Sequence, residues 1–322
     1  MSESRRILLV VHPNRPEVHD HALGVVKRLK AAGVAVAVIS DEMRGTPLED
    51  APDLISADPA DPTHGCELVC ILGGDGSILR AAELSRGSGV PLLGVNFGHV
   101  GFLAEVERDD LDVTVERIVS RQYTVEERMT LEVVAMHDGQ TVFKSWALNE
   151  VTVEKASRER MIELTVEIDG RPLSTWGCDG VVMATPTGST AYAFSAGGPV
   201  VWPDVEAMLL VPISAHALFA RPLVVGPDSQ LAVEVVPRTE GGGVVWCDGR
   251  RAIDLPPGAR IQVHRSADSV RLARFAASPF TDRLVEKFDL SVHGWRGAAR
   301  RASESAMGSG TESDAESGTE TG

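Results

Sequence analysis

Residues 68–84 read LVCILGGDGSILRAAEL: an unbroken apolar run, a glycine-rich turn and a second, more mixed segment. The run at residues 68–72 is apolar at every position, which is typical of a strand buried on both faces of a parallel sheet. In residues 78–84 the apolar side chains have helical spacing. A buried strand that leads through glycines into a helix is a building unit of α/β sheets, so this stretch predicts an α/β domain.

The same alternation continues on both sides of this stretch. Residues 18–32 have helical spacing, and Gly33 follows where a glycine commonly ends a helix. Three further apolar runs are expected to be strands: residues 7–11, 34–39 and 90–95. Fully apolar strands that alternate with helices predict a Rossmann-like parallel sheet covered on both faces, in a first domain of residues 1–120.

From residue 121 to residue 277 the pattern changes to short alternating segments, such as residues 130–136 and 161–168. Turn pairs such as Asp138-Gly139 separate several of these segments, as is usual in hairpins. The second domain is therefore predicted to be mostly β.

The end of the chain divides into two parts. Residues 280–296 return to a mixed apolar pattern, and we expect a segment of about residues 278–297 to pack on the first domain. The last residues, 298–322, are rich in Ser, Gly, Glu, Thr and Ala, and residues 302–322 contain five acidic and no basic side chains. Such a segment cannot bury a core, so a disordered acidic tail is expected.

Composition limits the functions that this chain can have. It has 322 residues, of which 43% are hydrophobic and 24% charged, as expected for a soluble protein of two domains. The formal net charge of −15 argues against a nucleic-acid partner, which needs a basic surface. No apolar run approaches the roughly 20 residues of a membrane span, so no membrane partner is expected. The four cysteines lack CxxC and zinc-site spacing, which favours a cytoplasmic protein with reduced cysteines.

The glycine-rich turn at residues 73–77, Gly-Gly-Asp-Gly-Ser, carries the first chemical signal. Glycines at the start of a helix let backbone N–H groups approach a phosphate. An acid would repel a phosphate, so Asp75 is expected to accept a proton from an attacking hydroxyl or to help hold a metal ion on the phosphates. A simple structural turn is the alternative. The turn is neither a Walker loop nor GxGxxG, which disfavours a Rossmann dehydrogenase.

Three other segments place polar groups where they suit a ligand. Three glycines in residues 94–103 follow a strand end, where ligands bind open α/β sheets, although a structural turn explains them equally well. Asn149 and Glu150 could read an adenine edge and a ribose hydroxyl, or form a solvated pair. Residues 178–199 are dense in hydroxyls and glycines, which suit phosphates and ribose, and Tyr192 could stack on a base.

Together these segments resemble the NAD kinase family, whose motifs occur here in the same order between about residues 5 and 297. The run Thr-Pro-Thr-Gly-Ser-Thr-Ala-Tyr at residues 185–192 is highly specific. Gly-Gly-Asp-Gly is not, because phosphofructokinases and diacylglycerol-type lipid kinases share it. The other matching segments are residues 98–103, 149–150, 179–180, 197–199, 221–223 and 248–249.

The resemblance implies an N-terminal α/β domain and a C-terminal β-sandwich-like domain, with the C-terminal segment returning to the first domain. It also implies an enzyme that phosphorylates the adenosine-ribose 2′-hydroxyl of NAD to give NADP. The donor would be ATP or inorganic polyphosphate, and the cofactor would be Mg²⁺ or another divalent metal. Since family members are homodimers or homotetramers, the same is expected of this chain.

The resemblance assigns roles to single residues at the phosphate-transfer end of the site. Asp75 would be the catalytic base for the 2′-hydroxyl of NAD. Gly74, Gly76 and Arg80 would lie beside the nucleotide. The resemblance does not name any residue of this chain as a metal ligand.

It assigns a second group of residues to NAD. Asn149, Glu150 and Arg160 would contact the dinucleotide, and Asp179 would hold its nicotinamide-side portion. The adenosine-side pocket would be lined by Thr187, Ser189, Thr190, Ala191, Tyr192, Ala193, Phe194, Ser195 and Asp248.

Three positions depart from the usual family pattern. Ser77 replaces a common Thr and keeps the hydroxyl, Arg250 stands where Gln is frequent, and Gly177 removes a basic contact. Two other functions are considered: a lipid kinase of the diacylglycerol-kinase type with the same Gly-Gly-Asp-Gly turn, and a non-catalytic NAD(P) sensor. Residues 187–192 argue against the lipid kinase, and Asp75 argues against the sensor.

Overall fold

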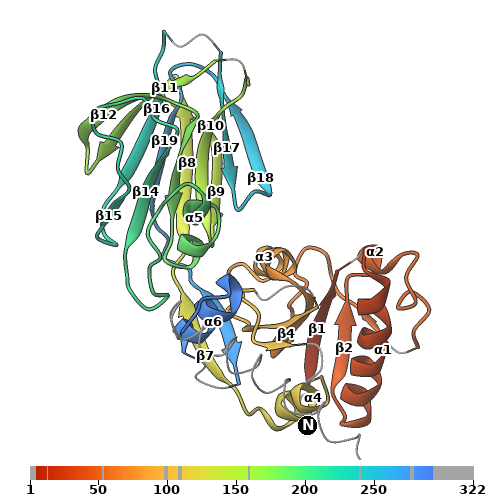
Figure 1. The fold of residues 1–322 in the computed structure, drawn as a ribbon. Helices are drawn as coiled ribbons and strands as arrows, with labels where there is room; N and C mark the ends of the chain where they lie inside the picture. The colour runs from red at the N-terminus through yellow and green to blue at the C-terminus, as the bar shows by residue number, and fades with distance from the viewer. Residues whose placement is uncertain are drawn as a thin grey trace, which may run out of the picture. The chain divides into compact units, whose positions relative to one another are not determined.

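The computed structural model describes residues 5–12, 14–52, 54–97, 101–107, 111–158, 160–238, 241–275 and 279–292. Up to residue 275 it contains an α/β part and an all-β part (Figure 1). Helix α6 (Phe280–Phe288) belongs to a separate compact unit and has no buried residues. None of the helices in the described ranges is both long and apolar enough to cross a membrane.

The first sheet has eight strands within the described residues, in the order β3-β2-β1-β4-β5-β20-β7, with β6 beside β5. All neighbouring pairs are parallel except β20 and β7. The strands are β1 (Arg6–Val11), β2 (Ala35–Val38), β3 (Ile55–Ser56), β4 (Leu68–Gly73), β5 (Leu92–Asn96), β6 (Val106–Glu107), β7 (Thr124–Arg128) and β20 (Val270–Arg274).

Side chains from both faces of this sheet are buried, which explains why its central strands are apolar at every position. In β1, Ile7 and Leu9 join one core cluster with α1, whereas Leu8 and Val10 join a second cluster with α3. The helices of this part are α1 (Pro16–Ala31), α2 (Ser40–Met43), α3 (Asp75–Leu84) and α4 (Leu111–Ser120).

The all-β part consists of two six-stranded antiparallel sheets, counted within the described residues. One has the order β15-β14-β13-β10-β17-β18, and the other has the order β12-β11-β16-β19-β8-β9. The strands of the first are β10 (Glu150–Lys155), β13 (Gly180–Ala184), β14 (Met208–Ile213), β15 (Leu223–Val225), β17 (Gly243–Cys247) and β18 (Arg251–Leu255). The strands of the second are β8 (Leu131–His137), β9 (Gln140–Ala147), β11 (Ile162–Ile168), β12 (Arg171–Cys178), β16 (Leu231–Val235) and β19 (Arg260–Arg265).

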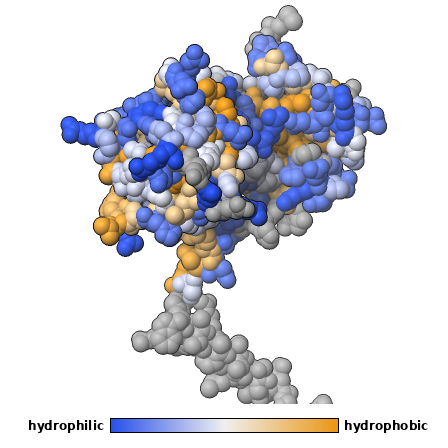
Figure 2. Space-filling view, turned by 90° about the horizontal axis from the view of Figure 1, so that it is seen from above, coloured by the Kyte–Doolittle hydropathy of each residue, from blue (hydrophilic) through white to orange (hydrophobic). Residues whose placement is uncertain are grey.

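A shared apolar core makes these two sheets a sandwich. Val151 and Val153 of β10 and Val133 of β8 belong to the same buried cluster, although they come from different sheets. The outer face of the first of these sheets is partly covered by the 3₁₀ helix η2 (Thr187–Thr190) and by α5 (Tyr192–Ser195), which Figure 1 shows over the strands. Hydrophilic residues cover most of the face seen in Figure 2.

The predicted fold class, an α/β domain followed by a β-sandwich-like domain, is confirmed. The chain returns to the first sheet at β20, which pairs with β5 and β7. Both β7 and β20 lie within residues 121–277, the range expected for the β-rich domain, yet both belong to the first sheet. The expected acidic tail, residues 298–322, lies outside the described residues.

Candidate active site

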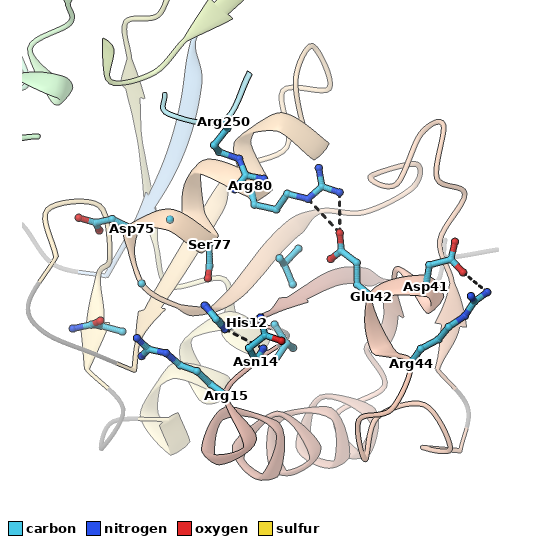
Figure 3. Close-up of a pocket in the computed structure, with 15 residues that line it drawn as sticks. His12, Asn14, Arg15, Asp41, Glu42, Arg44, Asp75, Ser77, Arg80 and Arg250 are labelled. Carbon is cyan, nitrogen blue, oxygen red and sulfur yellow. Dashed lines mark hydrogen bonds and ion pairs between the residues drawn. The ribbon is translucent and has the colours of Figure 1, made fainter. Parts of the chain in front are cut away.

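The Gly-Gly-Asp-Gly turn lies where β4 ends and α3 begins, beside a pocket of about 800 Å³. The pocket is lined from the ends of β1 and β5 and from the first turn of α3. Arg250, in the turn between β17 and β18, also lines it (Figure 3). The pocket thus lies at the carboxyl ends of parallel strands, where open α/β sheets bind ligands.

Different glycines of this region serve different purposes. A Cβ on Gly73 would lie 2.7 Å from Cβ of Ser77, so glycine at this position lets α3 begin directly after β4. By contrast, a Cβ on Gly74 or Gly76 would meet no atom within 4 Å, and neither residue has a positive φ. The fold therefore does not need glycine at these two positions. The absence of a side chain there would instead let a phosphate approach the backbone N–H groups.

The Asp75 carboxylate is held by a loop from another part of the chain. Its Oδ2 accepts a hydrogen bond from the backbone N–H of Phe102 at 3.1 Å, and its Oδ1 accepts one from Leu103 at 3.1 Å. A Cβ on Gly101 would lie 2.9 Å from Cγ of Asp75, so only glycine fits there. The motif at residues 98–103 therefore orients this carboxylate through residues 101–103. Its first part, residues 98–100, lies outside the described residues.

Four guanidinium groups line the same pocket. Arg80 pairs with Glu42 at 2.8 Å, Arg44 pairs with Asp41 at 2.7 Å, and Arg250 pairs with Glu83 at 3.0 Å. The fourth is Arg15, which donates to the carbonyl of Phe97 at 2.9 Å. Figure 3 shows Arg80 beside Arg250 above the pocket and Arg15 below it. Cations fixed in this way suit an anionic ligand with several phosphates.

His12, at the end of β1, also lines this pocket. Burial lowers the pKa of its imidazole, and the nearby charge of Arg15 lowers it further. The side chain is therefore mostly neutral at pH 7, so the fixed positive charges that line the pocket are the four guanidinium groups.

The second group of expected residues lies at the start of β10. Asp248 accepts hydrogen bonds from the backbone N–H groups of Leu148 at 2.9 Å, Asn149 at 2.7 Å and Glu150 at 3.3 Å. Arg251 adds an ion pair at 2.9 Å. Asp248 is only 7% exposed, so in this structure its carboxylate fixes the backbone that carries Asn149 and Glu150.

The carboxyl group of Glu150 is buried and incompletely paired. Burial and, to a smaller extent, the nearby charge of Asp248 raise its pKa to about 8, although a hydrogen bond from the backbone N–H of Tyr192 opposes this shift. Among the described residues no group hydrogen-bonds to its Oε2. Since buried polar atoms are rarely left unpaired, this oxygen is a natural partner for a hydroxyl or amine of a ligand.

Part of the hydroxyl-rich run is used to build the turn itself. The Thr185 hydroxyl donates to the carbonyl of Leu148 at 2.6 Å, and the Ser189 hydroxyl donates to the carbonyl of Val201 at 3.1 Å. Both side chains are fully buried. A Cβ on Gly188 would lie 2.8 Å from Cα of Asn149, so glycine lets this turn approach the backbone just before β10. Ser189 and Ala193, expected in the NAD pocket, are thus completely enclosed by protein.

Other side chains of the run face outward. Tyr192, Phe194 and Ser195 are exposed, Thr190 and Ala191 are partly exposed, and Thr187 is 9% exposed. Burial raises the pKa of the Tyr192 hydroxyl, and the nearby charges of three carboxylates raise it further: Glu154, Asp179 and Glu150. They therefore gather on the outer face of the sheet around Tyr192.

Asp179 and Arg160 lie farther along the sheet. Asp179 pairs with Lys155 at 2.5 Å, and the hydrogen bond from Lys155 lowers the pKa of this carboxyl despite opposing desolvation. Residues 154 and 180 are paired in register, so Asp179 lies at the opposite end of the β10–β13 pair from Asn149 and Glu150. Arg160 is exposed in the turn between β10 and β11.

The expected site residues thus form two groups. Gly74, Asp75, Gly76 and Arg80 lie together at the pocket. Except for Arg160, the residues expected to bind NAD lie on or beside β10, β13, η2 and α5, and Asp248 is hydrogen-bonded to the backbone of Asn149. Seven polar residues that line the pocket were not predicted from the sequence: His12, Asn14, Arg15, Asp41, Glu42, Arg44 and Asn96. His12, Asn14 and Arg15 come directly after the first strand, and this position could have indicated a ligand site.

The described residues hold no group of three or more His, Cys, Asp or Glu side chains that could bind a metal by themselves. Mg²⁺ in phosphoryl-transfer sites usually needs only one or two carboxylates, because phosphates and water supply its other ligands. Asp75 lines the pocket and could supply one such carboxylate.

Residues 7–123 match the model of the ATP-NAD kinase N-terminal domain, and residues 148–275 match that of the ATP-NAD kinase C-terminal domain. NAD kinase 2 of Streptomyces coelicolor is 58% identical over 294 residues, covering 91% of this chain and 97% of that protein. The NAD kinase of Leifsonia xyli subsp. xyli is 59% identical over 300 residues, covering 92% and 98%.

Two solved structures have the same fold. Yeast NADH kinase complexed with NADH has a TM-score of 0.79 at 24% identity, covering 91% of this chain and 89% of that one. An NAD kinase from Archaeoglobus fulgidus in complex with ATP has a TM-score of 0.68 at 25% identity, covering 89% and 100%. These matches confirm the family predicted from the motifs and do not point to a lipid kinase or a sensor. This chain belongs to the NAD kinase family.

Proposed function

We propose that this protein transfers the terminal phosphoryl group of ATP or inorganic polyphosphate to the adenosine-ribose 2′-hydroxyl of NAD. The family and relatives named as NAD kinases support this reaction. The observation that carries the proposal is the Asp75 carboxylate, which two backbone N–H groups hold beside a pocket lined by four guanidinium groups. A fixed carboxylate and a phosphate-binding pocket are what transfer to a hydroxyl requires.

The donor phosphates are assigned to the pocket at the start of α3. Gly74 and Gly76 leave the backbone open there, and the helix N-terminus has no side-chain cap. Its partial positive charge and the guanidinium groups of Arg80 and Arg250 favour a polyanion. ATP and polyphosphate share this chemistry, so we propose both as donors.

In the proposed mechanism Asp75 accepts the proton of the NAD 2′-hydroxyl as its oxygen attacks the terminal phosphorus. The bond from phosphorus to the leaving oxygen breaks, and the guanidinium groups of the pocket stabilise the charge on the departing phosphates. A divalent ion such as Mg²⁺, when bound with the donor, would neutralise charge on the phosphate oxygens, and Asp75 would be its protein ligand.

We assign NAD to the outer face of the sandwich beside α5. Glu150 has a buried oxygen that needs a partner, and Tyr192 offers an exposed ring for stacking. Asn149, Thr187 and Thr190 supply further polar groups, with Asp248 holding the backbone in place. The carboxylates of Glu154 and Asp179 near Tyr192 suit the positively charged nicotinamide ring of NAD⁺, for which Asp179 is the proposed partner.

The assembly and the cellular location are also part of the proposal. Large apolar side chains stand exposed near the NAD residues, among them Tyr192, Phe194 and Trp202. Exposed apolar groups close together support association of copies of the chain as homodimers or homotetramers. We place the protein in the cytoplasm, because three of its four cysteines are buried and all four are unpaired.

The first experiment is an assay of NADP formation with purified protein, NAD, Mg²⁺ and either ATP or polyphosphate. We expect NADP, measured with an NADP-specific dehydrogenase, from at least one donor. Binding of NAD without NADP formation from either donor would contradict the kinase and favour the sensor.

Substitution of Gly76 separates donor binding from folding. Gly76→Ala places a methyl group where the protein has no atom within 4 Å and where φ is not positive, so the fold should tolerate it. Replacing glycine with alanine in a compatible conformation stabilises by about 0.4–1 kcal/mol. We expect the melting temperature to stay constant or rise, while the KM for the donor increases several-fold because the methyl group obstructs the phosphates. An unchanged donor KM would remove Gly76 from the donor site.

Substitution of Arg250 tests whether the part of the pocket that comes from the sandwich binds the donor. We expect Arg250→Ala to raise the KM for ATP roughly 5-fold and to leave the KM for NAD nearly constant, because a partly exposed charged contact is worth about 1 kcal/mol. The increase should shrink at high salt, which screens exposed charges. Arg238→Ala removes an exposed arginine of the sandwich that pairs with Glu163 and is the matched control. Equal effects of both variants would argue against a role for Arg250.

A further inference from the structure

The position of the Asp75 carboxylate depends on the segment Gly101 to Glu105 rather than on α3 alone. Two backbone N–H groups of this segment, from Phe102 and Leu103, bind the two carboxylate oxygens. Gly101 leaves the space in which the carboxylate lies. Any shift of this segment must therefore move or release Asp75.

A single buried arginine of β20, Arg274, holds this segment in place by hydrogen bonds and an ion pair. Nη1 of Arg274 donates to the carbonyl of Leu103 at 3.1 Å and to that of Ala104 at 3.5 Å. The same nitrogen pairs with Glu105 at 3.1 Å, and both side chains of this pair are only 3% exposed. The backbone N–H of Phe275 donates to the other carboxylate oxygen of Glu105 at 3.0 Å.

The second anchor of Arg274 lies in the first sheet. Its Nε pairs with Glu126 of β7 at 3.2 Å, and β20 pairs with β7 along the full length of both strands. The guanidinium therefore connects a fixed sheet to a segment that has little regular structure of its own. Leu103 lies at the centre of this connection, because its carbonyl binds Arg274 and its N–H binds Asp75.

Stability alone gives a weak reason for such a pair. Replacing a buried ion pair with apolar groups often leaves a protein as stable as before, because desolvation of the charges offsets their attraction. What the pair provides here is a fixed position of two carbonyl groups next to the residues that hold Asp75.

We propose that Arg274 is a positioning residue for the phosphoryl transfer: through the segment Gly101 to Glu105 it sets the orientation of the Asp75 carboxylate. This inference rests on the proposed function, in which Asp75 is the base. Arg274 touches neither NAD nor the donor in this scheme, so its effect should appear in kcat and not in KM.

The test compares Arg274→Met with Arg260→Met. Arg260 forms a bidentate ion pair with Glu167 in the sandwich, at 2.7 and 2.6 Å. Its side chain is 29% exposed, and it serves as a control arginine outside the contacts of Asp75. We expect Arg274→Met to lower kcat about 10-fold or more with both KM values within about 3-fold, since a misplaced reacting group can cost up to 10²-fold. Arg260→Met should keep its kcat. Arg274→Lys, which retains the charge, should recover part of the loss and guards against failure of the Met variant to fold.

Two further measurements distinguish positioning from general damage. In an Asp75→Asn background, Arg274→Met should cause almost no additional loss of kcat, because both changes remove the same contribution. A full additional 10-fold loss would overturn the proposal.

Hydrogen exchange of the Phe102 and Leu103 amides should accelerate in Arg274→Met and not in Arg260→Met. Unchanged exchange there would also overturn it, and this readout decides the inference even if the wild type forms no NADP.

Discussion

Asp75→Asn is expected to lower kcat for NADP formation by about 10²-fold or more, the usual size of a general-base contribution. Asparagine keeps the shape of the side chain, but its amide cannot accept the proton of the 2′-hydroxyl. The backbone N–H groups of Phe102 and Leu103 would also lose one carboxylate acceptor, since one side of the amide is itself a donor. The loss should persist with saturating NAD and donor, because it concerns the chemical step.

Asp41→Asn is a matched control for this variant. Asp41 lines the same pocket, but it pairs with Arg44 at 2.7 Å and has no proposed role in proton transfer. We expect its kcat to stay within about 3-fold of the wild-type value, since exposed ion pairs contribute little. Near-normal turnover by Asp75→Asn would remove Asp75 from the mechanism. Loss of NAD binding by Asp75→Asn, measured by calorimetry, would instead indicate a role in binding.

The α/β fold could be predicted because its signal is local. Residues 7–11 and 68–72 are apolar at every position, and the structure buries both faces of these strands. The return of the chain at β20 was harder to predict, since its sequence Val-Arg-Leu-Ala-Arg mixes apolar and basic residues, as the strands of the sandwich mix apolar and polar ones. Its two arginines do not mark a solvent-facing side, because Arg274 is buried against Glu105.

The site could be predicted only as far as its residues lie in recognisable motifs. Asp75, Gly74 and Gly76 were predicted as site residues from such a motif and line the pocket, and the segment to which Gly101 belongs was also singled out. That this segment holds the Asp75 carboxylate depends on hydrogen bonds across 27 and 28 residues. Arg274 acts across 171 residues, and no local pattern indicates such a contact.

The hydroxyl-rich run shows a further limit of reading residue types alone. Thr185, Ser189 and Gly188 carry the same chemical signal as their neighbours, yet they bind or contact the protein backbone. A dense polar run can thus be specific because it builds an unusual turn, while only its exposed members remain available to a ligand. Tyr192 and Thr190 belong to those exposed members.

Glu150→Gln is expected to remove a large part of the pH dependence of stability. Burial raises the pKa of Glu150 from 4.5 to about 8 in the folded protein, so the folded state keeps a proton that the unfolded state releases. Stability is then fully present below about pH 4.5 and is lost as pH rises through about 8. At 1.36 kcal/mol for each unit of pKa, the wild type should lose on the order of 3–5 kcal/mol over this range. The neutral glutamine has no proton to lose at this site.

Urea unfolding of the wild type and of Glu150→Gln, at pH 5 and pH 8.5 and constant ionic strength, measures this difference. The variant should be close to the wild type at pH 5 and clearly more stable than it at pH 8.5. Some dependence on pH should remain, because burial also raises the pKa of Asp248. Glu154→Gln, four residues along the same strand and only partly buried, should lose stability in parallel with the wild type. Equal losses in the wild type and in Glu150→Gln would mean that Glu150 is ionised in the folded protein and that its Oε2 is already paired.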